Sequence, residues 1–290
     1  MAKIIGGLAT SHVPAVGVAV DRGRCGDPYW APYFAKVEPL RAWVKALNPD
    51  VCIVVYNDHA NAFSLEIIPT FAIGLADSYR PADEGFGRRP VPDVPGHPDL
   101  AWHLAQSLII DEFDMTLVNA MEVDHGLTVP LSVMFGQPEA WPCPVVPILV
   151  NVVQFPPPTG RRCLKLGKAI RRAVASYSGA ERILVVGTGG MSHQLQARRA
   201  GLVNPEFDSR FIDLIVADPE GAASITHTEY LREAGSEGIE LVMWLVMRGA
   251  MTEEVDEVYR ATHLPTSNTH NGLVALAPRS NGPDASLAKD

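Results

Sequence analysis

The chain has 290 residues, of which 47% are hydrophobic and 20% charged, a composition that suits a globular protein with one large core or two small ones. Its formal net charge of −9 and pI near 5.5 argue against nucleic acid as a partner, because binding phosphates requires clustered Lys and Arg. The four cysteines are too far apart in the sequence for a CxxC pair, so we expect reduced thiols in a cytoplasmic protein.

No segment of the sequence is expected to enter a membrane. The first residues lack a basic region followed by a long apolar run, so no signal peptide is expected. The most apolar helical segment, residues 239–247, is too short to span a bilayer and contains a glutamate.

The N-terminal part of the chain alternates strand-like and helix-like patterns. Apolar runs predict strands over residues 3–9 and 51–56, and apolar side chains at spacings of three and four predict a helix over 29–47. The run 51–56 is almost entirely β-branched and apolar, which is typical of a strand with helices on both faces. A strand, a helix and a second strand in this order indicate a parallel sheet.

A segment rich in proline and glycine, residues 80–98, follows a weaker strand predicted over residues 71–75. Long connections in compact domains are usually functional or cover a site. We therefore expect this segment to belong to the domain rather than to link two domains.

The rest of the chain continues the alternation of helices and strands. Helices are predicted over residues 100–113, 163–175, 207–217 and 230–247, and strands over 115–119, 145–153, 183–186 and 272–277. There is no internal repeat and no linker long enough to divide the chain. We expect a single α/β domain over residues 1–278, with a central, mostly parallel or mixed sheet between helical layers, and a polar, flexible tail over residues 279–290.

Three histidines stand just after predicted strands. His193 lies in the glycine-rich stretch Gly187-Thr188-Gly189-Gly190-Met191-Ser192-His193, whose spacing does not match a nucleotide-binding loop. His12 and His59 follow two other strands. Open α/β sheets place their sites at the carboxyl ends of strands, and neighbouring strands lie about 4.8 Å apart, so these imidazoles can converge on one edge of the sheet.

Several acidic and amide side chains could complete such a site. Asn57 and Asp58 precede His59 and could orient its ring, although both could equally cap the end of the strand. Glu240 interrupts an apolar helical run, where it either faces solvent or requires a cation, a proton or hydrogen bonds. His125 follows an acidic turn.

Two imidazoles and one carboxylate form the facial triad of non-haem Fe(II) oxygenases. The same three side chains can hold zinc for hydrolysis. The ligands alone therefore leave the metal open.

Seven stretches of the sequence carry a resemblance to a known family: Ser11–Pro14, Tyr56–Ala60, Ile68–Gly74, Pro81–Gly85, Asp124–Gly126, Gly187–Leu195 and Gly235–Trp244. Together they resemble the LigB-type (class III) extradiol ring-cleaving dioxygenases, and in particular the catalytic β subunits of protocatechuate 4,5-dioxygenases. The likeness runs from about residue 3 to residue 277.

The resemblance implies roles for individual residues. It implies that His12, His59 and Glu240 bind Fe(II), that His193 is the active-site acid and base, and that His125 is a second active-site histidine. Ser267 is similar to a family residue that touches the substrate. Asn57 is also expected near the substrate, and Asp58 behind the metal ligands.

The resemblance further implies that O2 and a catecholic acid are the substrates, most simply protocatechuate, which would be opened to 4-carboxy-2-hydroxymuconate semialdehyde. It implies either a separate small α subunit that closes the active site in an α2β2-like assembly, or a family member that works without one. Thr266 departs from the family pattern and could shift preference towards gallate or another substituted catechol. A non-redox zinc hydrolase or binding protein on the same fold is the alternative from another class.

Overall fold

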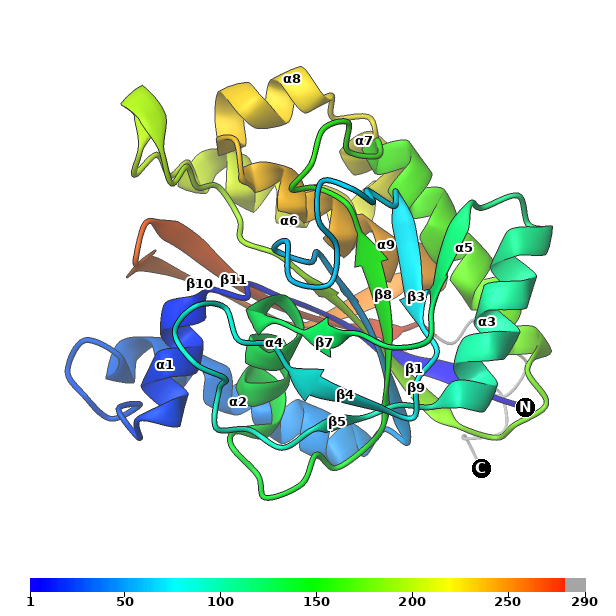
Figure 1. Cartoon of the computed structure of the whole chain (residues 1–290). Coiled ribbons are helices and arrows are strands. Elements are labelled where there is room, and N and C mark those ends of the chain that lie inside the picture. Colours follow the sequence, from blue (N-terminus) through cyan, green and yellow to red (C-terminus); the bar gives the residue numbers. More distant parts are fainter. Residues whose placement is uncertain (280–290) are drawn as a thin grey trace, which may run out of the picture.

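The computed structural model describes residues 1–279, apart from the side chains of residues 265 and 266. At its centre is an eight-stranded sheet with the strand order β10-β11-β1-β9-β2-β8-β3-β6 (Figure 1). The strands are β1 (Lys3–Thr10), β2 (Val51–Tyr56), β3 (Phe71–Gly74), β6 (Met115–Val118), β8 (Val145–Val150), β9 (Arg182–Thr188), β10 (Val255–Thr266) and β11 (Thr269–Pro278).

The sheet is mixed, with a parallel centre. Strands β1, β9, β2 and β8 pair in parallel, whereas β11 pairs antiparallel with β1 and β10, and β3 pairs antiparallel with β8. All six residues of β2 are buried, as expected for a strand covered on both faces. The carboxyl ends of the four central strands therefore meet at one edge of the sheet.

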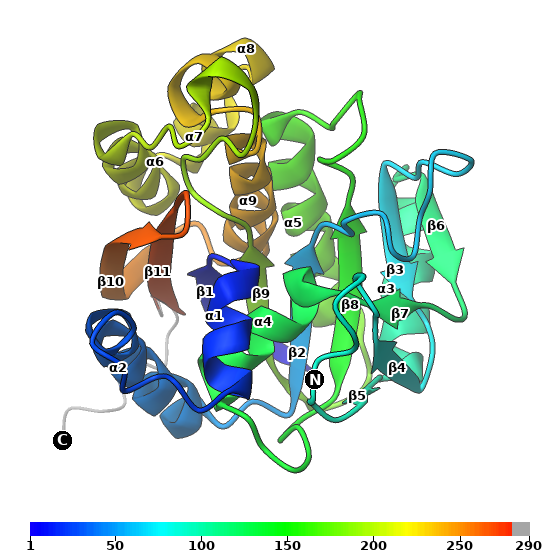
Figure 2. The same cartoon turned by 60° about the vertical axis from the view of Figure 1, so that its left-hand side comes forward.

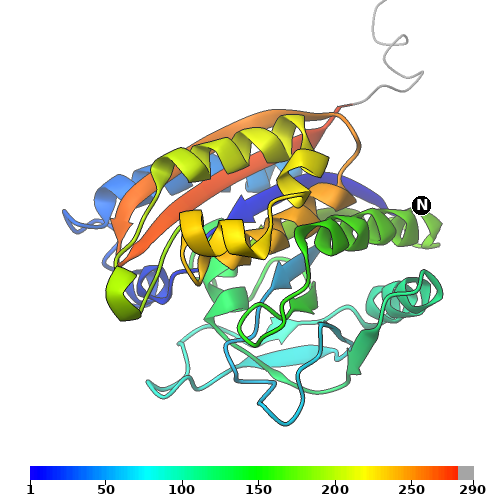
Figure 3. The same cartoon turned by 90° about the horizontal axis from the view of Figure 1, so that it is seen from above.

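Helices cover both faces of the sheet (Figure 2), so the predicted single α/β domain with a mixed sheet between helical layers is confirmed. One layer consists of α1 (Pro14–Asp21), α2 (Ala31–Leu47) and α4 (His125–Phe135). The other consists of α3 (Pro98–Ile110), α5 (Gly160–Ser176), α6 (Pro205–Ala217), α7 (Pro219–Ala223) and α9 (Val242–Ala250). The short α8 (His227–Glu229) lies between α7 and α9 in the chain. Seen from above, α6 runs along the hairpin of β10 and β11 (Figure 3).

The segment 80–98 contributes to a small second sheet rather than a plain loop. Its strands are β4 (Ser78–Pro81), β5 (Val94–Pro95) and β7 (Glu122–Val123), in the order β5-β4-β7. Strand β7 runs directly into α4 (Figure 1). The segment thus lies beside the start of α4, which carries His125.

The prediction of one continuous helix over residues 230–247 is wrong. It consists of a π-helical turn (Tyr230–Ala234), a 3-10 turn (Gly238–Leu241) and α9. Gly235 breaks the chain between the first two pieces with a left-handed φ of 89°, which non-glycine residues rarely adopt. Glu240 consequently lies in the 3-10 turn before α9, not within a long helix.

Two further expectations concern membrane-spanning helices and the C-terminal tail. Within the described residues, no helix is both long enough and apolar enough to cross a membrane. The expected flexible tail falls, apart from Arg279, on residues outside those that the structure describes.

Candidate functional site

A cavity lies at the carboxyl ends of β1, β2 and β9, and we call it the site cavity. Its described lining includes five side chains that can bind a metal or move a proton: His12, His59, His125, His193 and Glu240. The structure therefore brings together all the histidines and the carboxylate that the sequence singled out.

The Glu240 carboxylate lies close to three of these histidines. Glu240 is only 6% exposed, and its Oε2 lies 3.3 Å from Nε2 of His12. Its Oε1 lies 3.8 Å from Nε2 of His59. Ligand atoms at about 2.1 Å from one metal ion are roughly 3–3.4 Å apart, so the pair His12 and Glu240 has ligand spacing and His59 stands slightly wider.

His125 offers a second possible arrangement. One ring nitrogen each from His12, His59 and His125 lie within 4.8 Å of one another. The rings of His59 and His125 face each other, with centroids 4.0 Å apart and a tilt of 31°. His12 and His59 belong to both arrangements, so the fit of a cation to this cavity does not depend on choosing between them.

Partners outside the cavity orient the rings of His12 and His59. Nδ1 of His12 is hydrogen-bonded to Oγ1 of Thr188, at 3.0 Å. Nδ1 of His59 donates to Oδ2 of Asp124, also at 3.0 Å. Both rings thus turn Nε2 towards Glu240, which is how metal-binding histidines are usually held.

Asp58 and Asn57 are placed differently from each other. The Asp58 carboxylate accepts hydrogen bonds from the backbone N–H groups of residues 61–63, so the orienting contact we expected from it comes from Asp124 instead. Asn57 is fully buried, with Nδ2 3.1 Å from Nε2 of His59. Its Oδ1 has no partner among the described residues, which leaves an acceptor free beside the cavity.

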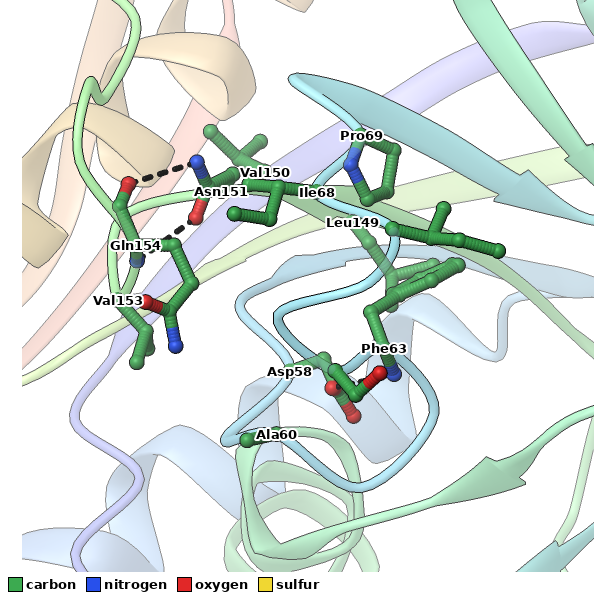
Figure 4. Close-up of a pocket in the computed structure, with 12 residues that line it drawn as sticks. Asp58, Ala60, Phe63, Ile68, Pro69, Leu149, Val150, Asn151, Val153 and Gln154 are labelled. Atoms are coloured by element: carbon green, nitrogen blue, oxygen red, sulfur yellow. Dashed lines mark hydrogen bonds between the residues drawn. The ribbon is translucent and has the colours of Figure 1, made fainter.

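Asp58 also lines a smaller hollow, the side pocket, next to the site cavity (Figure 4). The segments around residues 58–69 and 149–154 enclose it. Val153 lines both the side pocket and the site cavity. The two hollows therefore share this side chain in their walls.

The protonation states of two residues suit metal ligands. Burial lowers the pKa of His12. Burial alone would raise the pKa of Glu240, but the neighbouring imidazoles, His12 first, outweigh it and hold that pKa well below its usual range. A neutral imidazole and an ionised carboxylate are the forms that bind a cation.

His59 has a different balance. Burial lowers its pKa, but hydrogen bonds to Asp124 and Glu240 outweigh burial and raise the pKa to about 10. A cation that binds Nε2 would have to displace a proton there.

The glycine-rich turn after β9 serves both His193 and Glu240. Nδ1 of His193 donates to the carbonyl oxygen of Met191 at 2.8 Å, which leaves Nε2 as the free acceptor. The backbone N–H of Gly190 donates to Oε2 of Glu240 at 2.6 Å. Gly189 has a φ of 135°, and a Cβ atom there would meet the backbone oxygen of Glu240 at 2.9 Å.

A buried polar network supports this turn from behind, and sequence reasoning did not find it. Asp208 on α6 accepts from Ser192 Oγ and from Nδ1 of His270, which is only 4% exposed. The contacts join residues far apart in the sequence, so no local pattern indicates them.

Glu84 was also missed, although it lies in the stretch Pro81–Gly85. Its carboxylate accepts from the backbone N–H of His125 at 2.8 Å and contacts Nδ1 of the same residue. An acidic residue inside a recognised stretch was the available signal.

Ser267 lines the site cavity together with Thr269. Ser267 has a left-handed φ of 58°, and its backbone N lies 3.4 Å from the hydroxyl of Tyr29. The side chain of Thr266 lies outside the part of the chain that the structure describes.

Comparison with known families decides between the classes of function that the ligands left open. Residues 6–272 match the family model described as the catalytic LigB subunit of aromatic ring-opening dioxygenase. The chain belongs to this family. The description of this family names the opening of aromatic rings by a dioxygenase, and enzymes of the family depend on a metal. The zinc hydrolase and the binding protein are thereby disfavoured.

Two LigB relatives show how far the likeness extends. A gallate dioxygenase of Pseudomonas putida KT2440 is 44% identical over 185 residues, which cover 64% of this chain and 54% of the relative. A 2,3-dihydroxyphenylpropionate/2,3-dihydroxicinnamic acid 1,2-dioxygenase of Burkholderia vietnamiensis G4 is 29% identical over 255 residues, covering 73% and 78%. The match thus spans about half the length of the gallate dioxygenase.

A solved structure supports the fold alone. The crystal structure of an uncharacterized protein from Escherichia coli K12 superimposes with a TM-score of 0.57 and 13% sequence identity, covering 95% of this chain and 100% of the other.

Proposed function

We propose that this LigB protein cleaves the ring of a catecholic acid with O2, and that Fe(II) is its metal, held by His12, His59 and Glu240. The observation that carries the proposal is the buried Glu240 carboxylate, which lies beside Nε2 of His12 and of His59. A third imidazole, that of His193, lies close by, and its Nδ1 is hydrogen-bonded to a backbone carbonyl oxygen. When bound there, a ferrous ion would supply sites for the two ring oxygens and for O2.

The donor set fits such an ion. A buried carboxylate is costly without a cation or rich hydrogen bonding, and Glu240 accepts the Gly190 N–H on one oxygen only. Asn57 lies beside His59, with Nδ2 3.1 Å from Nε2 of the ring, and its Oδ1 has no partner among the described residues. We propose that Asn57 contacts the substrate.

We assign His193 the role of acid and base. Its Nε2 lies 3.9 Å from Oε2 of Glu240, farther than Nε2 of His12. Because its Nδ1 proton is committed to the Met191 carbonyl oxygen, Nε2 can accept a proton from a substrate hydroxyl and return it later.

We assign His125 the second active-site position. It lines the cavity next to the ring of His59. There it can contact an oxygen atom of the bound substrates and stabilise negative charge as it develops.

The substrate we propose is protocatechuate or its close analogue gallate. The relative with 44% identity is a gallate dioxygenase, which supports gallate alongside protocatechuate, our first expectation. Among the described lining residues there is no Lys or Arg. We therefore assign the hydroxyls of Ser267 and Thr269 as the donors to the substrate carboxylate. Thr266 is the third contact that we assign, from its position in the sequence.

We further propose that a small α subunit closes the cavity. Two apolar side chains that line the cavity are exposed, which supports a covering partner. They are Leu195, at 53%, and Val153, at 46%.

The test is oxygen uptake by the protein reconstituted anaerobically with Fe(II). Protocatechuate, gallate and 3-O-methylgallate are compared in an oxygen electrode, with and without a candidate α subunit. We expect uptake with protocatechuate or gallate, and a yellow semialdehyde product from protocatechuate. No uptake with any catechol in the presence of iron and partner would refute the proposal.

A further inference from the structure

The start of α4 holds two carboxylates that act in the same way on two different rings. Asp124, the N-cap residue, accepts from Nδ1 of His59 and from the backbone N–H of Gly126, at 2.8 Å. Glu84 accepts from the backbone N–H of His125, and its other oxygen contacts Nδ1 of the same residue. The first turn of a helix leaves its N–H groups without partners, so both carboxylates are anchored on the helix as well as on a ring.

We propose that Glu84 is the positioning residue of His125. It fixes the ring with Nδ1 turned away from the cavity and Nε2 turned into it, as Asp124 does for His59. The proposal depends on the proposed function only in that His125 is taken to act on the substrates.

The fold explains how Glu84 reaches this place. Residues 80–98 form strands β4 and β5, and β4 pairs in parallel with β7, which ends one residue before Asp124. The pairing brings Pro81 opposite Val123, so Glu84 stands just beyond the pair, beside the first turn of α4. The long segment therefore serves the site through one side chain.

The ring of His125 needs such an anchor. It stacks on the ring of His59 with centroids 4.0 Å apart, a contact that a half-turn about χ2 would preserve while exchanging each ring nitrogen with a ring carbon. The contact of Nδ1 with Glu84 distinguishes the two orientations. Without it, the ring can turn and place a carbon where Nε2 faces the cavity.

The experiment uses three variants. Glu84→Ala removes both contacts with His125. Glu84→Gln keeps the size of the side chain but offers one acceptor oxygen, so it cannot accept from both N–H groups. Asp83→Asn is the matched control, since the Asp83 carboxylate accepts from the N–H groups of Gly85 and Gly87 in the same loop.

In the iron-loaded enzyme we expect Glu84→Ala and Glu84→Gln to lower kcat about 10–100-fold, the usual effect of losing a residue that orients a site histidine. KM and iron content should stay within about twofold of the wild-type values. Asp83→Asn should behave like the wild type. If Asp83→Asn lost as much activity as Glu84→Ala, the role of Glu84 would be only to fold the loop and the proposal would be overturned.

A second measurement does not depend on activity. In protein labelled with 15N-histidine and loaded with Zn(II), the His125 signals, assigned with His125→Gln, should show the proton on Nδ1 in the wild type and lose this preference in both Glu84 variants. An unchanged Nδ1 proton in the variants would overturn the proposal. Should the wild type consume no O2 with any catechol, the proposed function fails while this measurement still decides the role of Glu84.

Discussion

Three histidine rings turn Nε2 towards Glu240, and the rings differ in the group that holds the other nitrogen, Nδ1. Thr188, Asp124 and the carbonyl oxygen of Met191 hold Nδ1 of His12, His59 and His193 in turn. Three similar imidazoles can therefore serve different purposes. The partners make that difference testable residue by residue.

His193→Ala should leave the metal in place and slow turnover. We expect kcat to fall about 10²–10⁴-fold, the usual contribution of a positioned acid and base, with iron content close to the wild-type value. His59→Ala should instead lose iron, measured with a colorimetric chelator. His103→Ala is the control, because His103 contacts Ala173 and Ser176 on α5. Iron and full activity in the His193 variant would contradict the assignment.

Asp124 and Asp58 lie close in space but should differ in their effect on the metal. Asp124→Asn weakens the anchor of His59, so we expect metal affinity to fall about 10–100-fold. Asp58→Asn alters contacts with loop N–H groups rather than with a ring and should leave affinity within about twofold. Competitive titration with Zn(II) measures both. Equal losses would mean that loop structure, not ring orientation, controls affinity.

At the scale of elements, the turn after β9 joins two parts of the site. It carries His193, and its Gly190 N–H holds Glu240 from the 3-10 turn before α9. The approach is close because glycine leaves no Cβ at position 189, where the backbone of Glu240 passes. The turn therefore sets the distance between His193 and the Glu240 carboxylate.

Gly189→Ala should disturb the site by pushing Glu240 away. A left-handed backbone costs about 1–3 kcal/mol for a residue with a side chain, and Gly201→Ala should carry this cost alone, since Gly201 has a φ of 85° and open space around it. Urea denaturation measures the cost. We expect metal affinity to drop only in Gly189→Ala, and an equal drop in Gly201→Ala would show that the contact with Glu240 is unimportant.

The central strands could be predicted from the sequence because their residues are buried on both faces. The run 51–56 coincides with β2. Strand β10 was missed because its residues Val255–Thr266 mix charged and apolar side chains at the edge of the sheet. Helix α4 was missed because it contains Pro130 and begins with His125-Gly126, which weaken any helical pattern.

The sequence also pointed to His12, His59, His125, His193 and Glu240, which the structure brings to one cavity. Asp124, Glu84 and Thr188 lie in the recognised stretches, but the sequence did not identify them as partners of these rings. Which side chains meet depends on contacts across the fold, and no periodicity or spacing encodes those contacts.

At the scale of the whole molecule, the candidate ligands come from β1, β2 and the turn before α9, far apart in the chain. A cation that binds all three would stabilise the folded state only, because the unfolded chain does not hold them together. Metal content and global stability should therefore be coupled.

Zn(II) at about 100 times its Kd should raise the free energy of unfolding of the wild type by about 2.7 kcal/mol. Glu240→Gln keeps the size of the side chain but removes its charge, so the gain should largely vanish. Thermal denaturation with and without a chelator measures the effect. A similar rise of Tm in the Gln variant would place the cation elsewhere.

The shared wall at Val153 has a consequence for the range of molecules that the protein can accept. One small side chain belongs to both the site cavity and the side pocket, and it is none of the residues assigned to metal or proton chemistry. Shortening it would extend the room for a ring substituent towards Phe63 and Ile68 (Figure 4). Substitution of Val153 is therefore expected to change which ring substituents fit the site cavity while the residues assigned to metal and proton chemistry stay the same.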